Sequence, residues 1–242
     1  MDDPWSRFNH KSYRFTRAVD RAVIAPVIHA YIRVTPQPVR HGLSSAIDNL
    51  TEPRTVGNDI LQGRFKPAGE AAGRFVLNTV FGLGGFLDVA TGAGLEKHES
   101  DFGQTLGRYG APSGPYIFVP LAGPSSVRDG FGRLVDVFAD PLGYAFGGVN
   151  TIFNGARAGV GVVVDRDNAD EQLNQVDSDF TDPYAAIRSA YSQQRANQID
   201  IARGRAPNTV SDLPDFGPEP QAQPRSKTEP QPQQAQPQPQ RP

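Results

Sequence analysis

The chain has 242 residues, which is enough for one domain with a sizeable core and an additional tail. Its 24 Lys and Arg residues nearly balance 26 Asp and Glu residues, and no basic block is interleaved with aromatic side chains, so nucleic acid is not an expected partner. The absence of cysteine excludes disulfides, thiolate metal sites and a lipid-modified cysteine in the sequence as given. The first residues show no apolar secretory core, which leaves a cytosolic protein or an exported one whose targeting segment has been removed.

The N-terminal segment predicts an amphipathic helix that Asp2 or Asp3 caps and Pro4 opens. Its apolar and basic side chains fall on separate arcs: Trp5, Phe8 and Phe15 on one, and Arg7, Lys11 and Arg14 on the other. Such a helix could cover the core of a soluble domain, or lie in a membrane interface with its cations toward phosphate headgroups. Pro26 should end or kink it.

Three further helical pieces are expected over about 39–50, 52–65 and 67–82. The third has a small-residue face at Gly69, Ala72 and Gly73 and is apolar nearly all round afterwards, so it must be buried in protein or in lipid. Its uncharged run is too short to cross a hydrocarbon core of about 30 Å. Because prolines and glycines also divide the apolar run 137–156, no transmembrane helix is expected.

Between Arg108 and Arg128 the chain carries no charge but four prolines, which exclude a continuous helix. Turn-forming residues at 112–115, with Gly114 free to take positive φ, precede the β-prone run 116–119 and predict a short, apolar, hairpin-like loop. Backbone of this kind is tolerated near a bilayer only inside protein or along a cavity. The alternative is an ordinary buried loop of a soluble domain.

The C-terminal third begins with a predicted helix over about 155–175 that changes from apolar to acidic. A second helix should start at the Asp182 cap, end near Arg203 and bury a stripe that consists of Tyr184, Ile187, Tyr191 and Ile199. The Pro- and Gln-rich remainder predicts an extended, mobile tail. We therefore expect a helical domain at 1–206 and a disordered tail at 207–242.

No catalytic constellation is recognisable in the sequence. The four histidines lack metal-site spacing, no serine lies in a hydrolase motif, and the glycine-rich run at 82–87 departs from a dinucleotide loop. The polar cluster 95–102 is interpreted as a solvated loop or helix cap in preference to an acid–base site. An enzyme, a metal site and a cofactor are therefore not expected.

Short motifs nevertheless follow one another in order from the N-terminus to about Arg203. They are DPW (3–5), FNHK (8–11), VTPQPVR (34–40), NDILQG (58–63), GRF (73–75), NT (78–79), GLEKH (94–98), DFGQTLG (101–107), PSGPY (112–116), GPSSVRD (123–129) and DPY (182–184). Together these motifs resemble the MlaA/VacJ family of Gram-negative outer-membrane lipoproteins. The lipidated cysteine and signal peptide of that family are missing from this sequence, and the tail has no counterpart in the motifs.

The resemblance implies a mainly α fold, in which a ring of amphipathic, partly membrane-embedded helices surrounds a central channel in the periplasmic leaflet. It also implies a function: mislocalised phospholipid leaves the outer leaflet through the channel and passes to the periplasmic carrier MlaC, which maintains lipid asymmetry. Trimeric porins are the implied membrane partners. A porin-associated adaptor without a transport path of its own is the alternative.

Within this picture we expect three groups of functional residues. The loop sets the channel width, through Gly110, Pro112, Ser113, Gly114, Pro115, Pro120, Gly123 and Pro124. The helix at 39–50 lines the channel with Ser44, Ser45, Asp48 and Asn49. The first helix lies in the membrane interface through Trp5, Phe8, Phe15, Arg7, Lys11 and Arg14.

Overall fold

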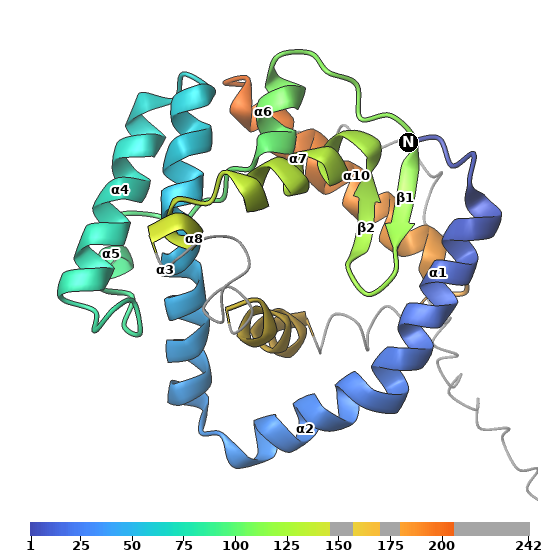
Figure 1. Ribbon diagram of the computed structural model, residues 1–242, viewed down its shortest axis with the longest axis horizontal. Helices are drawn as coiled ribbons and strands as arrows, with labels where there is room; N and C mark the ends of the chain where they lie inside the picture. Colours follow the sequence, from blue (N-terminus) through green and yellow to red (C-terminus); the bar gives the residue numbers. More distant parts are fainter. Residues whose placement is uncertain (146–156, 170–179, 206–242) are drawn as a thin grey trace, which may run out of the picture. The chain divides into compact units, whose positions relative to one another are not determined.

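The computed structural model describes residues 1–145, 157–169 and 180–205, and Met1–Pro207 forms one compact unit. The predicted fold class is confirmed, because this unit is mainly helical with one small antiparallel sheet (Figure 1). Its elements are α1 (Ser6–Val19), the π-helix η1 (Asp20–Ile24), α2 (Ala25–Val34), α3 (Gln37–Leu61), α4 (Phe65–Val80), α5 (Val89–Gly92), α6 (Phe102–Arg108), β1 (Tyr116–Val119), β2 (Gly123–Ser126), α7 (Val127–Phe138), α8 (Pro141–Ala145) and α10 (Pro183–Ala202). A further helix occupies residues 157–169. None of the helices in these described stretches combines the length and hydropathy of a membrane-spanning segment.

The elements of this unit form a closed circuit, which can be followed in Figure 1. The chain runs without a long loop from α1 through η1 and α2 into α3. From there the circuit continues through contacts, since α3 packs on α6, α6 on α7, α7 on β2, and β1 on α1. The last contact rests on Asn9, whose side chain donates to the Tyr116 carbonyl (3.1 Å) and accepts from the Phe118 amide (2.8 Å). The helices are therefore arranged as a ring.

The start of α1 differs from the prediction. The helix begins at Ser6, and Trp5 is its N-cap residue without a side-chain hydrogen bond, so the expected aspartate cap and the opening Pro4 were wrong. Asp3 is engaged elsewhere: it accepts hydrogen bonds from Asn9 and Tyr184 and pairs with Arg188. These tertiary contacts hold the carboxylate away from the helix N-terminus. Pro26 does not end the helical run as predicted: the chain passes from α1 through η1 into α2 without a gap, and Pro26 lies in the first turn of α2, where its missing N–H is tolerated.

The predicted division near residue 51 is also wrong, since α3 is one continuous helix with Pro53 inside it. A proline at this place costs about 3 kcal/mol through its lost hydrogen bond and its ring clash. Contacts with α4 offset that cost: Glu52 accepts a hydrogen bond from Arg74 (2.8 Å), and Asn49 donates to Thr79 (3.0 Å). Tertiary packing thus overrides a local helix-breaking signal.

Helix α4 packs through small side chains one position away from the predicted face. Ala68 and Ala71 are buried, whereas nothing lies within 4 Å of a Cβ built at Gly69. On the other side of the helix Val76 and Val80 are exposed by 55% and 64%. The apolar surface of α4 is therefore not covered by the described part of the protein.

Other elements of the ring also expose apolar side chains and bury polar ones. Large apolar side chains are exposed on several elements, among them Trp5, Phe8, Phe15, Val23, Val76, Val80, Phe81, Phe131, Leu134 and Phe138. The buried side chains include many polar and charged ones, such as Asn9, Asp20, Asn49, Glu52, Asn58, Asp59, Gln62, Arg74, Asp129, Asp136 and Arg195. A protein surrounded by water on all sides rarely exposes so much apolar surface. This distribution is typical of a protein whose outer surface contacts lipid.

The predicted hairpin is present. Strands β1 and β2 pair antiparallel, with Val119 opposite Gly123, and residues 120–122 make the turn. Gly114 has the predicted positive φ (+68°). Tyr116 and Phe118 of β1 pack with Tyr184 and Tyr191 of α10 in a buried aromatic cluster. The hairpin is thus tied to both ends of the described chain.

Helix α10 confirms the prediction for its segment, because the Asp182 side chain accepts from the Ala185 amide and Tyr184, Tyr191 and Ile199 are buried. Other predictions fall partly or wholly on residues 146–156, 170–179 and 206–242, which lie outside the described residues. They include the second half of the apolar run, both ends of the helix at 155–175 and the tail.

Candidate functional site

A cavity of about 590 Å³ lies between α3, α7 and the helix at 157–169. Its lining combines the apolar side chains Ile47, Val137 and Val162 with the charged side chains Arg54, Arg133, Arg157, Asp136, Asp140 and Asp165. A molecule bound in this cavity would therefore contact both charged and apolar side chains.

The helix at 157–169 is held in place by ion pairs from three directions. Arg157 pairs with Asp140 (2.5 Å), just before α8. Asp167 pairs with Arg40 of α3 (2.6 Å). Arg166 pairs with Asp20 of η1 (2.7 Å), which is itself buried. These three partners come from separate parts of the ring. The ion pairs therefore fix the position of the helix at 157–169 relative to η1, α3 and the start of α8.

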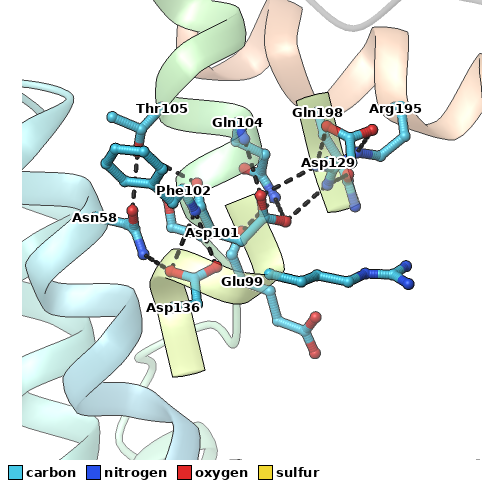
Figure 2. A network of polar contacts seen from close by, with 12 residues as sticks. Asn58, Glu99, Asp101, Phe102, Gln104, Thr105, Asp129, Asp136, Arg195 and Gln198 are labelled. Atoms are coloured by element: carbon cyan, nitrogen blue, oxygen red, sulfur yellow. Dashed lines mark hydrogen bonds and ion pairs between the residues drawn. The ribbon is translucent and has the colours of Figure 1, made fainter. Parts of the chain in front are cut away.

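Asp136 lines the cavity and is also hydrogen-bonded to neighbouring elements of the ring; Figure 2 shows these hydrogen bonds. Asp136 accepts hydrogen bonds from the Asn58 side chain (2.9 Å) and from the Phe102 amide (3.1 Å). Asn58 in turn accepts from the Thr105 hydroxyl (3.0 Å). One carboxylate thereby joins α3, α6 and α7, and burial raises its pKa above the ordinary value.

Arg195 of α10 forms a second polar centre, also drawn in Figure 2. Its guanidinium reaches Asp101, the N-cap of α6 (2.7 Å), and Asp129 of α7 (2.9 Å). Burial alone would raise the pKa of both carboxyls, but the hydrogen bonds and charge of Arg195 lower them below the ordinary value. Tyr191 also donates to Asp129. Three helices meet at this one arginine.

The predicted lining residues of α3 have different surroundings. Ser44 accepts from Asn168 (3.2 Å), so it faces the inner helix. Asp48 pairs with Lys97 (2.8 Å) and lies close enough to the cavity residue Asp165 to raise its pKa. Asn49 is buried against Thr79 of α4 and faces away from the cavity. Ser45 is half-buried and does not line the cavity.

The predicted hairpin residues are not brought together with Ser44 and Asp48. Gly110, Pro112 and Ser113 line a different cavity of about 460 Å³, beside α10. Pro124 contacts the cavity of about 590 Å³, called the main cavity below, because its carbonyl accepts a hydrogen bond from the cavity residue Arg133 (3.3 Å). The hairpin thus touches the main cavity through one of its arginines.

The predicted apolar and basic residues at and after the start of the first helix are all exposed. Phe8 and Phe15 are 53% and 54% exposed, and Trp5 is 46% exposed. Arg7, Lys11 and Arg14 are exposed as well. The alternative in which this apolar face covers a core is wrong, since Asn9 and Ser12 form the buried face.

Sequence reasoning missed most of the cavity residues. Arg54, Arg133 and Arg157 each lie in a different element and belong to none of the motifs. A usable signal was Asp140, the only charge in the apolar run 137–156, because an isolated charge in such a run needs a partner. That partner is Arg157.

An exposed apolar surface, a polar frame and an amphipathic cavity together define a ring-shaped, membrane-associated helical protein. Comparison with known proteins gives the family. The model of the MlaA lipoprotein family matches residues 1–198. The chain belongs to this family.

Individual relatives agree with this assignment. The Escherichia coli (strain K12) protein named intermembrane phospholipid transport system lipoprotein MlaA is 33% identical over 227 residues, which cover 90% of this chain and 88% of that protein. An uncharacterized protein of Rickettsia prowazekii (strain Madrid E) is 32% identical over 198 residues, covering 81% and 78%. A solved structure described as "Structural basis for maintenance of bacterial outer membrane lipid asymmetry" superposes with a TM-score of 0.72 at 31% identity, covering 82% of this chain and 100% of that one.

Proposed function

We propose that this protein is an outer-membrane phospholipid channel that removes mislocalised phospholipid from the outer leaflet and passes it to a periplasmic carrier. This proposal rests mainly on the cavity inside the ring, where arginines and aspartates lie beside Ile47, Val137 and Val162. The names of the relatives, which refer to intermembrane phospholipid transport and to lipid asymmetry, support the same function.

The physical problem for such a protein is the headgroup. Moving a phosphate through hydrocarbon is very costly, whereas the acyl chains already lie in a suitable environment. A ring with charged groups inside and apolar side chains outside meets both needs without a covalent step. We therefore propose no catalytic residues and no cofactor, and the direction of net transport follows from the affinity of the carrier.

The position of the protein follows from the same surfaces. We propose that α1 lies in the periplasmic leaflet, with Trp5, Phe8 and Phe15 in the apolar layer and its cations toward phosphate groups. We also propose that Ser44 and Asp48, which do not line the cavity itself, extend the polar path along α3; their contacts with Asn168 and Lys97 support this. A trimeric porin beside the ring and the carrier MlaC below it remain the proposed protein partners, and 207–242 remain the proposed tail.

The hairpin is the proposed control of channel width. Gly110 and Gly123 have φ values of +93° and +83°, and no atom lies within 4 Å of a Cβ built at either position. Replacing Gly110 or Gly123 with Val therefore strains the backbone by about 1–3 kcal/mol, while its Cβ meets no neighbouring atom. We expect altered lipid flux from a folded ring. Gly69→Val, at an open position of α4, is the control; equal flux in all three variants would remove the hairpin from the mechanism.

The function is tested by complementation. The chain is expressed with a lipoprotein signal peptide and lipidated cysteine in a Gram-negative strain that lacks its own MlaA, and phospholipid in the outer leaflet is quantified. A fall to the normal level without lysophospholipid supports a channel. No fall despite outer-membrane placement and co-purification with porin would support the adaptor, and lysophospholipid would indicate an enzyme.

A further inference from the structure

Several charged side chains of the cavity between α3, α7 and the helix at 157–169 form no ion pair within the described residues. Arg157 is paired with Asp140. Within residues 1–145, 157–169 and 180–205, neither Arg54 nor Arg133 forms an ion pair with a carboxylate, and Asp165 forms none with a cation. The charge of Arg54 acts on Asp136, but that carboxylate is already hydrogen-bonded by Asn58 and the Phe102 amide. The cavity thus contains two guanidinium groups without an ion pair and, at Asp165, an exposed carboxylate without one.

The surroundings of these groups favour a ligand. The Nε atom of Arg54 is buried and has no hydrogen-bond partner, which costs free energy unless something binds there. Among the described residues Arg133 donates one long hydrogen bond, to the Pro124 carbonyl (3.3 Å), so its guanidinium can reorient toward a ligand. Arginine side chains are well suited to phosphate, because their planar donors match two phosphate oxygens at once.

The carboxylate of Asp165 has the opposite requirement. Desolvation in the cavity and the negative charges of Glu99 and Asp48 raise its pKa, so its ionised form is less stable here than it would be in water. The charge of Lys97 opposes this effect, but Lys97 is already paired with Asp48. A positively charged group bound in the cavity would therefore stabilise the ionised carboxylate of Asp165.

One class of headgroup carries both charges. A phosphate linked to a primary amine, as in phosphatidylethanolamine, has a negative phosphodiester and a positive ammonium separated by two carbons. The apolar side chains Ile47, Val137 and Val162 in the same cavity suit the glycerol and the first acyl carbons. An anionic headgroup such as phosphoglycerol would satisfy the arginines and leave Asp165 without a partner.

We propose that the cavity between α3, α7 and the helix at 157–169 is a headgroup site that prefers zwitterionic phosphate–amine lipids, with the phosphate at Arg54 and Arg133 and the ammonium at Asp165. This inference rests on the proposed function and adds the lipid class. Because Asp165 is exposed at the cavity, its pair with an ammonium is worth about 1 kcal/mol, which corresponds to a roughly fivefold preference.

The test uses the full chain, purified in detergent and incubated with equal amounts of phosphatidylethanolamine and phosphatidylglycerol that share the same acyl chains. Bound lipid is extracted and quantified by mass spectrometry. We expect the native chain to retain phosphatidylethanolamine about fivefold over phosphatidylglycerol. Asp165→Asn should bring the two lipids to equal amounts, and Asp165→Glu should restore the preference. Arg54→Gln and Arg133→Gln should lower the binding of both lipids.

The matched control is Glu70→Gln, which neutralises a carboxylate of α4 that does not line the cavity and should leave the ratio unchanged. Equal binding of the two lipids by the native chain would overturn the headgroup preference whether or not the variants fold. An unchanged preference in folded Asp165→Asn would overturn the role of Asp165. Either result leaves the channel standing if complementation succeeds, whereas failed complementation contradicts the proposed function itself.

Discussion

Replacing Arg195 with Gln should destabilise the ring more than any surface substitution. Arg195 is 8% exposed and pairs with Asp101 and Asp129, so its loss leaves Asp101 without its cation and leaves Asp129 with Arg128 alone. Breaking a buried pair in this way costs about 3–5 kcal/mol. Because the Asp101 side chain is 27% exposed and can be partly rehydrated, we expect the lower end, about 3 kcal/mol.

The pH dependence of this effect has a defined sign. Arg195 lowers the pKa of both carboxyls below the ordinary value of 3.8. Groups with a depressed folded-state pKa stabilise the fold above the unfolded pKa and lose that contribution as pH falls through the folded pKa. The difference between native chain and variant should therefore be constant at neutral pH and shrink at pH values below 3.8.

The assay is thermal unfolding of the full chain in detergent, followed by circular dichroism. For a chain of this size about 3 kcal/mol corresponds to a fall of roughly 6–12 °C in Tm. Arg205→Gln is the matched control, since Arg205 pairs with Asp200 at 3.4 Å but is 66% exposed, and its loss should cost less than about 1 kcal/mol. Equal shifts in the two variants would refute the idea that Arg195 holds α6, α7 and α10 together.

Three other perturbations address separate parts of the ring. Asn9→Ala should cost about 1–3 kcal/mol and speed hydrogen exchange at the Phe118 amide, which loses its acceptor; unchanged exchange would show that α1 does not hold the hairpin. The hydrogen bond with Asp59 raises the pKa of His98, so protonated His98 should stabilise the fold below about pH 6.5, with the contribution lost as pH rises through the folded pKa. Asp59→Asn should lower that pKa in an NMR titration, and an unmoved pKa would assign the shift to other groups. Phe8→Glu should weaken sedimentation of the chain with phospholipid vesicles, while equal sedimentation would argue against α1 as an interfacial helix.

Elements were predictable where local signals and tertiary contacts agree. The hairpin followed from prolines and a β-prone run, and α10 from the Asp182 cap and its apolar stripe. Local signals failed where a distant residue supplies a stronger contact. Pro53 could not end α3 because Glu52 is held by Arg74, and Asp3 could not cap α1 because it binds Tyr184 and Arg188.

The site was harder to predict than the fold for a related reason. The motifs that resemble the family mostly contain the polar frame, including Asn58, Asp101 and Asp129, which hold the ring closed. The cavity charges Arg54 and Asp165 come from separate helices and have no common spacing in the sequence. Only the folded ring brings them together, so they could not be recognised as a set.

The most direct test of the central claim is phospholipid exposure in the outer leaflet of a strain lacking its own MlaA, measured with the native chain and with Arg133→Gln at equal outer-membrane levels. If lipid passes the cavity inside the ring, the native chain should restore the normal level and Arg133→Gln should leave a measurable excess of exposed phospholipid. Full restoration by both proteins would contradict transport through this cavity, and no restoration by the native chain, in a host with matching porin and carrier, would contradict the channel altogether.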